Sequence, residues 1–139
     1  MWTDDLTVGI NEIDSQHREL FVRLERLLDA CMAGSEQVEV LRMLDFLGEY
    51  VVSHFETEER LQRDHGYPGY ESHRAEHDFL RTRLALFRKE IGQAGPTRDL
   101  VLRVNQLLID WLKTHIREVD REACDFLLKK MPAGADMFQ

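Results

Sequence analysis

Seven side chains in this sequence have the types and spacing of metal ligands. His54 and Glu58 are four residues apart, and so are His73 and His77. Four residues turn an α-helix by about 400°, so the two side chains of each pair project about 40° apart from one helical face. His17 lies on the apolar stripe of an earlier segment. Each pair can therefore reach one common centre, and His17 can add a nitrogen to it.

His115 and Asp120 complete the set, but they are separated by five residues. On a regular α-helix this spacing directs two side chains about 140° apart. Both can serve one centre only if the helix changes its pitch, for instance through a π-bulge, or if Asp120 belongs to a turn. We predict a local irregularity between His115 and Asp120.

This donor set predicts two metal ions. A lone histidine on an apolar stripe is more often a hydrogen-bonded core residue, but here histidines occur on four separate stripes. Unpaired ions in a helical interior cost several kcal/mol each, and a metal both neutralises and coordinates them. Five imidazoles and two carboxylates exceed the four ligands of tetrahedral zinc. Imidazole and carboxylate without thiolate favour non-haem iron over manganese or zinc. The predicted ligands are His17, His54, Glu58, His73, His77, His115 and Asp120.

Four amphipathic helices must position these ligands, because each segment repeats apolar residues every three or four positions. The expected fold is all-α, an antiparallel up-down-up-down four-helix bundle with an N-terminal arm and a short C-terminal helical extension. Asp14 or Ser15 is the expected cap of the first helix and Thr97 that of the last. The arm covers residues 1–12, and the helices about 14–33, 36–64, 70–92 and 97–130, with the irregularity near 115–120.

Length and charge narrow the function further. The 139 residues suit one domain, 1–139, and 43% hydrophobic residues allow a buried core. A formal charge of −8 disfavours nucleic acid and anionic membranes as partners. No apolar stretch is long enough for membrane insertion, and Cys31 and Cys124 are interpreted as small buried hydrophobes in a reducing compartment. A cytoplasmic location is expected.

The remaining polar residues near these motifs are expected to be peripheral. Glu59 is interpreted as a surface charge or as a hydrogen-bond acceptor behind the ligands, and His65 as a solvated loop residue. The run of Arg81, Arg83, Arg88 and Lys89 is expected to be a solvated face.

The order of these motifs resembles the hemerythrin family, in particular its single-domain bacterial members. The likeness includes Ile13-Asp14-Ser15-Gln16-His17, the segment His54-Phe55-Glu56-Thr57-Glu58, the run 73–77, Trp111-Leu112 and the run 115–120. The resemblance implies that His73, His77 and His115 hold one iron and that His17 and His54 hold the other. It also implies that Glu58 and Asp120 bridge the two ions with an oxo or hydroxo group. The iron with two histidines would then bind O2 reversibly.

The same resemblance gives an expected function, namely O2 storage, transport or delivery without a catalytic step. Leu20, Phe55, Trp111 and Ile116, each within about one turn of a ligand, are the expected wall of a dry O2 pocket. An O2 or redox sensor acting through a separate partner and a di-iron oxidase or peroxidase remain the alternatives. Nitric oxide and small anions remain open as further ligands, and the sequence identifies no protein partner.

Two positions depart from the family pattern. Family members often carry tyrosine where this chain has Ala123, and many carry methionine in place of Gln62. A smaller or more polar neighbour is expected to admit water, to speed autoxidation or to open a tunnel.

Overall fold

The structure, a computed structural model, describes residues 2–131, so residue 1 and residues 132–139 of the expected domain lie outside the described part. All regular elements of residues 2–131 are helical, which confirms the all-α prediction. They are the 3-10 helix η1 (Asp4–Leu6), α1 (Asn11–Met32), α2 (Gln37–Asp64), α3 (Tyr70–Ala94), α4 (Arg98–Thr114), the π-helix η2 (His115–Asp120) and α5 (Arg121–Lys130).

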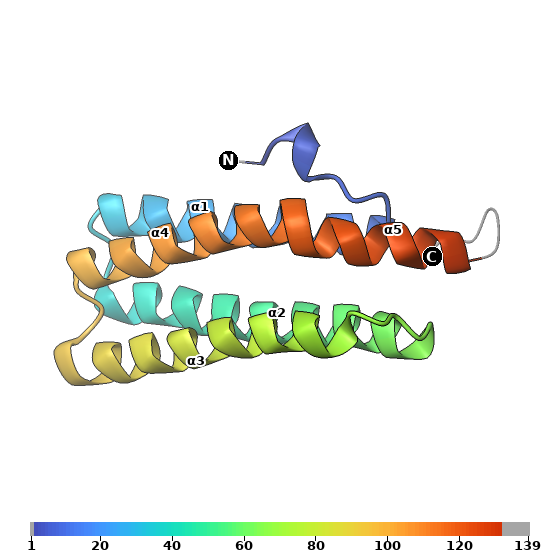
Figure 1. The fold of residues 1–139 in the computed structure, drawn as a ribbon. Coiled ribbons are helices and arrows are strands. Elements are labelled where there is room, and N and C mark those ends of the chain that lie inside the picture. The colour runs from blue at the N-terminus through green and yellow to red at the C-terminus, as the bar shows by residue number, and fades with distance from the viewer. Residues whose placement is uncertain (1, 132–139) are drawn as a thin grey trace.

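The four long helices lie side by side as an antiparallel bundle (Figure 1). Helix α1 contacts α2 and α4, and α3 contacts α2 and α4, so the four form a closed ring of neighbours. Helices α4, η2 and α5 continue one another as a single rod (Figure 1). The predicted four-helix bundle with a helical extension is therefore confirmed.

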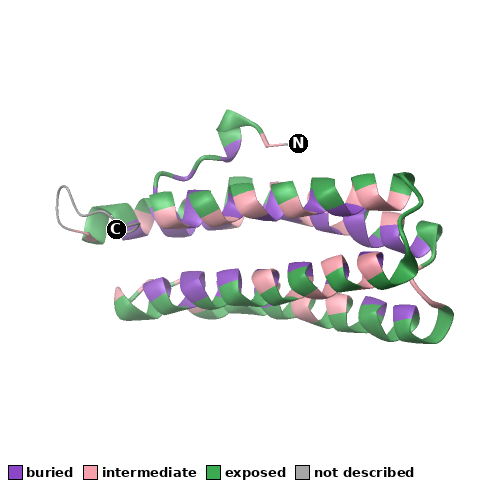
Figure 2. Ribbon diagram, turned by 180° about the vertical axis from the view of Figure 1, so that it is seen from behind, coloured by how far each residue is buried: buried purple, intermediate pink, exposed green. Residues whose placement is uncertain are grey.

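Buried residues lie on the inward faces of the helices, and exposed residues lie on the outward faces (Figure 2). Leu20, Leu24 and Leu27 of α1 are completely buried, as are Val51 of α2 and Leu108 of α4. Each such side chain contributes about 1.5–3 kcal/mol of hydrophobic stabilisation. The resulting core holds the helices at fixed positions around the polar cluster described below.

The helix ends differ in part from the expected bounds. The hydroxyl of Thr97 accepts a hydrogen bond from the Leu100 N–H at 3.3 Å, as a capping residue does. Helix α1, however, begins at Asn11 and not near residue 14. The Asp14 carboxylate accepts the N–H groups of Val8 at 2.8 Å and Gly9 at 3.1 Å. Asp14 thus stabilises the chain that enters the helix.

The N-terminal arm lies against the rod that carries η2 and α5. It ends at residue 10, two residues earlier than expected, because α1 starts sooner. Arg117 Nε donates to the Asp5 carboxylate at 2.7 Å, and Arg121 donates to the Asp5 backbone carbonyl. Trp2 packs edge-on against Phe21 with ring centroids 6.0 Å apart. These contacts tie the arm to the last segment of the bundle.

The two cysteines are free thiols in different surroundings. Cys124 is buried as expected, whereas Cys31 is only half-buried, because it lies near the exposed end of α1. Within the described part of the chain, no helix combines the length and apolarity needed to cross a membrane.

Candidate metal centre

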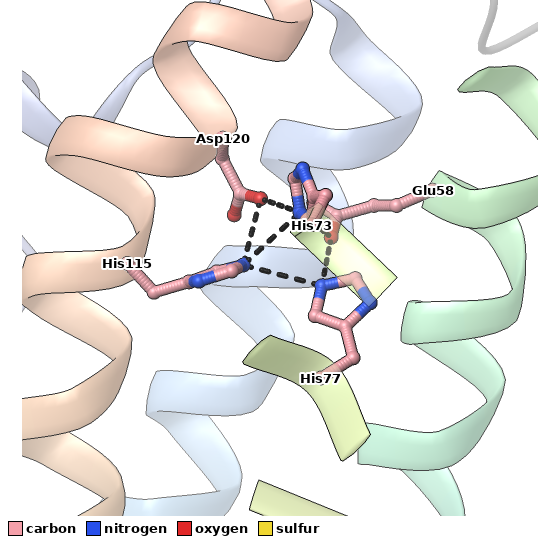
Figure 3. A group of neighbouring side chains, drawn as sticks. All are labelled: Glu58, His73, His77, His115 and Asp120. Atoms are coloured by element: carbon pink, nitrogen blue, oxygen red, sulfur yellow. Dashed lines mark hydrogen bonds and ion pairs between the residues drawn. The ribbon is translucent and has the colours of Figure 1, made fainter. Parts of the chain in front are cut away.

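Helices α1, α2 and α3 and the π-helix η2 contribute side chains to one buried polar cluster. The structure brings together all seven residues that the sequence singles out, and each is at most 3% exposed. Figure 3 shows five of them pointing toward one another from α2, α3 and η2. They form two overlapping groups whose nearest donor atoms lie within 4.8 Å of one another. We call them the three-histidine group (Glu58, His73, His77, His115, Asp120) and the two-histidine group (His17, His54, Glu58, Asp120).

In the three-histidine group, the Nε2 atoms converge. His115 Nε2 lies 3.2 Å from His77 Nε2 and 3.1 Å from His73 Nε2. Converging ring nitrogens repel one another when each presents a lone pair, unless a proton or a cation lies between them. The arrangement is therefore suited to a shared cation.

In the two-histidine group, both imidazoles approach the same carboxylate oxygen. Oε2 of Glu58 lies 3.3 Å from Nε2 of His17 and 3.3 Å from Nε2 of His54. The two rings lie edge to face with centroids 4.5 Å apart. This group offers one imidazole fewer than its neighbour.

Each carboxylate turns one oxygen toward each group. Oε1 of Glu58 lies 3.1 Å from His77 Nε2, while its Oε2 faces the two-histidine group. Asp120 Oδ1 lies 2.9 Å from His73 Nε2 and 3.1 Å from His115 Nε2, and its Oδ2 lies 3.1 Å from His17 Nε2. A carboxylate oriented in this way can contact two cations at once.

The π-helix explains how Asp120 joins the cluster. It spans His115–Asp120, where the sequence analysis expects an irregularity. In a π-helix, residues five apart are close in space, because hydrogen bonds run from i to i+5. His115 and Asp120 can therefore face the same centre, and α5 continues with Ala123 and Leu127 buried.

Burial and opposite charge compete in setting the pKa values of the histidines. Burial disfavours the imidazolium of His17, but Asp120 and Glu58 outweigh this and raise its pKa to about 9. The same balance raises the pKa of His73 to about 10. At His54 burial prevails, and the pKa is lowered.

The carboxylates show the complementary shift. Burial would raise the pKa of Glu58, but His54 and His17 hold it well below the usual value. Burial and the nearby Glu58 would also raise the pKa of Asp120, yet His115 and His17 lower it. Both carboxylates are therefore ionised, and the cluster favours cationic partners.

The donor set fits a pair of metal ions. Both ring nitrogens of His17 and both oxygens of Glu58 and of Asp120 are buried without a hydrogen bond of good geometry among residues 2–131. Buried polar atoms are rarely left unpaired, since each costs about 1–3 kcal/mol. Coordination through Glu58, Asp120 and His17 Nε2 would satisfy five of these six atoms.

Four histidines have an Nδ1 partner on their outer side. His77 Nδ1 donates to Glu59 at 2.7 Å, His115 Nδ1 to Glu76 at 3.1 Å, and His54 Nδ1 to Gln16 at 2.7 Å. The fourth contact joins His73 Nδ1 and the Gln62 amide at 3.0 Å. Metal-binding histidines use such partners to fix their tautomer and ring orientation.

Arg81 extends one of these contacts. Its guanidinium donates to Glu59 at 2.8 Å and to Asp78 at 2.7 Å, and it lies over the Phe55 ring. Arg81 thus leaves the solvated face on which the sequence analysis places it, because the buried Glu59 carboxylate attracts it. Of the two readings of Glu59, the structure agrees with the acceptor and not with the surface charge.

Sequence reasoning missed Gln16, Glu76 and Arg81. Gln16 and Glu76 each directly precede a histidine of the cluster, which indicates a polar side chain near the site, but each contacts a histidine of another helix. Arg81 carries no such signal. His65 also differs from its interpretation as a solvated residue: it is half-buried and donates from Nδ1 to the Leu61 carbonyl at 2.8 Å, where α2 ends.

The four residues expected to form the pocket wall differ in their burial and in the histidines that they contact. Phe55 is completely buried and stacks on His77, with centroids 3.8 Å apart and planes inclined by 6°. Trp111 is half-buried and stacks on His115 at 4.2 Å. Both aromatic rings thus lie against the three-histidine group. Leu20 and Ile116 are completely buried.

Comparisons with known proteins agree with this geometry. Residues 8–127 match the family model described as the hemerythrin HHE cation binding domain. A bacteriohemerythrin from Stenotrophomonas maltophilia is 34% identical over 125 residues, which cover 90% of this chain and 79% of the relative. A bacteriohemerythrin from Methylococcus capsulatus is 32% identical over 123 residues, covering 86% of this chain and 90% of the relative.

A solved structure shows the same fold. A crystal structure of a wild-type hemerythrin aligns with a TM-score of 0.81 at 30% identity, covering 91% of this chain and 96% of that one. The helical bundle and its imidazole and carboxylate donors define a cation-binding four-helix bundle. The chain belongs to the hemerythrin family. Family membership and the buried cluster together support a non-haem iron domain that binds O2.

Proposed function

We propose that this protein holds two iron ions and binds O2 reversibly for storage, transport or delivery. In this proposal His73, His77 and His115 ligate one ion, and His17 and His54 ligate the other. Glu58 and Asp120 bridge the ions together with an oxo or hydroxo group. Two adjacent irons would supply the O2 affinity and the electrons that pass to the gas and return on its release.

The orientation of the two carboxylates carries this proposal. Glu58 and Asp120 each direct one oxygen to each histidine group, so one pair of side chains can serve two cations. The two-histidine group has four protein donors and its neighbour has five. We therefore assign O2 to the two-histidine group.

Apolar side chains would protect this chemistry from water. Leu20, Phe55 and Ile116 are completely buried, and the Phe55 ring lies 6.0 Å from the His54 ring of the two-histidine group, whereas Trp111 lies against His115 of the neighbouring group. When water is excluded from the site, fewer protons reach the O2 that has accepted electrons, so its loss as a reduced oxygen species is slower. We propose these four residues as the O2 pocket wall.

The test is repeated oxygenation of the iron-loaded protein. The protein is reduced anaerobically, exposed to O2 and then deoxygenated, while the visible spectrum is followed through several cycles. A carrier returns to its starting spectrum each time. Irreversible oxidation in the first cycle, or sustained consumption of a reductant, would contradict the carrier function.

A sensor function is the second candidate, and the contacts of the N-terminal arm favour it. Arg117 of η2 and Arg121 of α5 both bind Asp5 of the arm, and Asp120 lies between them in the chain. A movement of Asp120 in the cluster would therefore be transmitted to these contacts between the arm and the rod. Partner binding that depends on oxidation state would support this function over carriage.

Three further assignments belong to the same proposal. The protein acts without catalytic turnover, because the cluster is rich in imidazole, whereas the di-iron carboxylate proteins are built on glutamates. Nitric oxide and small anions are competing ligands of the two-histidine iron. The location is cytoplasmic, in keeping with the free thiols of Cys31 and Cys124.

A further inference from the structure

Gln62 lies directly behind His73, on the side away from the cluster centre. It follows Glu58 by one turn of α2 and is 1% exposed. The amide nitrogen Nε2 lies 3.0 Å from Nδ1 of His73. The amide oxygen Oε1 has no hydrogen-bond partner among residues 2–131. One of the two polar atoms of this buried amide is thus left without a partner.

The other ring nitrogen of His73 faces the centre. Its Nε2 lies 2.9 Å from Asp120 Oδ1 and 3.1 Å from His115 Nε2. A cation bound there uses the Nε2 lone pair, so the hydrogen of the neutral ring must reside on Nδ1. This N–H then needs an acceptor, and among residues 2–131 the Gln62 amide is the one polar group in contact with His73 Nδ1, so its oxygen must supply it. A half-turn of the amide exchanges Nε2 and Oε1 with little change in shape.

From this geometry we propose that Gln62 is a positioning residue for metal at the three-histidine group. Its Oε1 accepts the Nδ1–H of metal-bound His73 and thereby fixes both the tautomer and the orientation of the ring. The proposal rests on the metal centre described under the proposed function.

The amide is suited to this position because it is neutral. The equivalent partner of His77 is the Glu59 carboxylate, whose charge is balanced by Arg81 at 2.8 Å. A carboxylate at position 62 would add another negative charge one turn from Glu58. Gln62 provides an acceptor at lower cost of burial than a charged group.

Zinc titration tests this role without iron or O2 chemistry. Zn²⁺ is competed against a chromophoric chelator in wild-type protein, Gln62→Met and Gln62→Glu. Methionine matches glutamine in length but its sulfur is a weak acceptor, whereas glutamate keeps the oxygen. We expect Gln62→Met to weaken one of two zinc sites by about 10- to 100-fold and Gln62→Glu to retain it. Gln106→Met is the matched control and should leave both zinc sites unchanged, since the exposed Gln106 amide donates to Asp110 at 2.9 Å and not to a residue of the cluster.

Nitrogen-15 NMR of zinc-loaded wild-type protein provides a second readout that requires no variant. The proposal predicts a hydrogen on His73 Nδ1 that exchanges slowly with water, and faster exchange in Gln62→Met. A His73 Nδ1 without hydrogen would overturn the proposal, even if Gln62→Met does not fold.

The titration separates this proposal from the metal centre itself. If the zinc affinities of wild-type protein and Gln62→Met agree within about twofold at both sites, the role of Gln62 alone is overturned. Equal losses in Gln62→Met and Gln62→Glu would also overturn it, because packing would then explain the effect. Failure of wild-type protein to bind zinc or iron would overturn the metal centre and this role together.

Discussion

Replacing Glu59 with glutamine tests the hydrogen bond behind His77. Glu59 Oε2 accepts from His77 Nδ1 at 2.7 Å in a buried setting, so the contact is a charge-assisted bond once His77 binds a cation. Charge-assisted bonds contribute about 1.5–3 kcal/mol and neutral ones about 0.5–1.5 kcal/mol. The Glu59→Gln change should therefore cost about 1–1.5 kcal/mol of metal binding, roughly a tenfold loss of affinity.

The matched control is Glu76→Gln. Glu76 makes the corresponding contact to His115 Nδ1 at 3.1 Å, but its side chain is 45% exposed, against 9% for Glu59. Solvent screens an exposed carboxylate, so we expect a loss below about threefold. The assay is anaerobic titration with Fe²⁺, with circular dichroism to verify that both variants fold. Wild-type affinity in Glu59→Gln, or equal losses in the two variants, would refute the reasoning.

Three further predictions concern protons, ligands and packing. Metal binding should release protons and become tighter as the pH rises through about 9 to 10, because His17 and His73, whose pKa values are raised, must lose a proton to bind metal. Calorimetry in buffers of different ionisation enthalpy measures the number of protons released. Metal binding that does not depend on pH would contradict this prediction. The His77→Ala variant should hold well below two irons per chain by metal analysis, whereas His65→Ala should retain two, and two irons in the former would count against its role as a ligand. The Leu27→Ala variant should lose about 2–5 kcal/mol of unfolding free energy in urea while keeping its iron content, because Leu27 is completely buried; a loss below about 1 kcal/mol would be inconsistent with its place in the core.

The fold was accessible from sequence because its signals are local. Apolar residues at helical spacing identify the helices, and Thr97 marks the start of α4. The spacing of His115 and Asp120 does not fit a regular α-helix, and the π-helix lies between these residues. Asp14 is expected as a helix cap but binds the preceding chain, because a carboxylate near a helix start can do either and only tertiary structure decides between them.

The residues that contact the donors from outside could not be predicted from the sequence, because these contacts form only in the tertiary structure. Gln62 could be recognised only as a departure from the family pattern, since its contact with His73 joins two helices. The same holds for Arg81, which reaches from α3 to Glu59 on α2. Hydrophobic periodicity specifies which face of a helix is inward, but not which polar side chains meet across the interface.

The most direct test of the central claim is anomalous diffraction at the iron absorption edge from crystals of the iron-loaded protein. The account predicts two iron peaks, one in the three-histidine group and one in the two-histidine group, with Glu58 and Asp120 contacting both. A single peak, or iron bound away from these side chains, would contradict it.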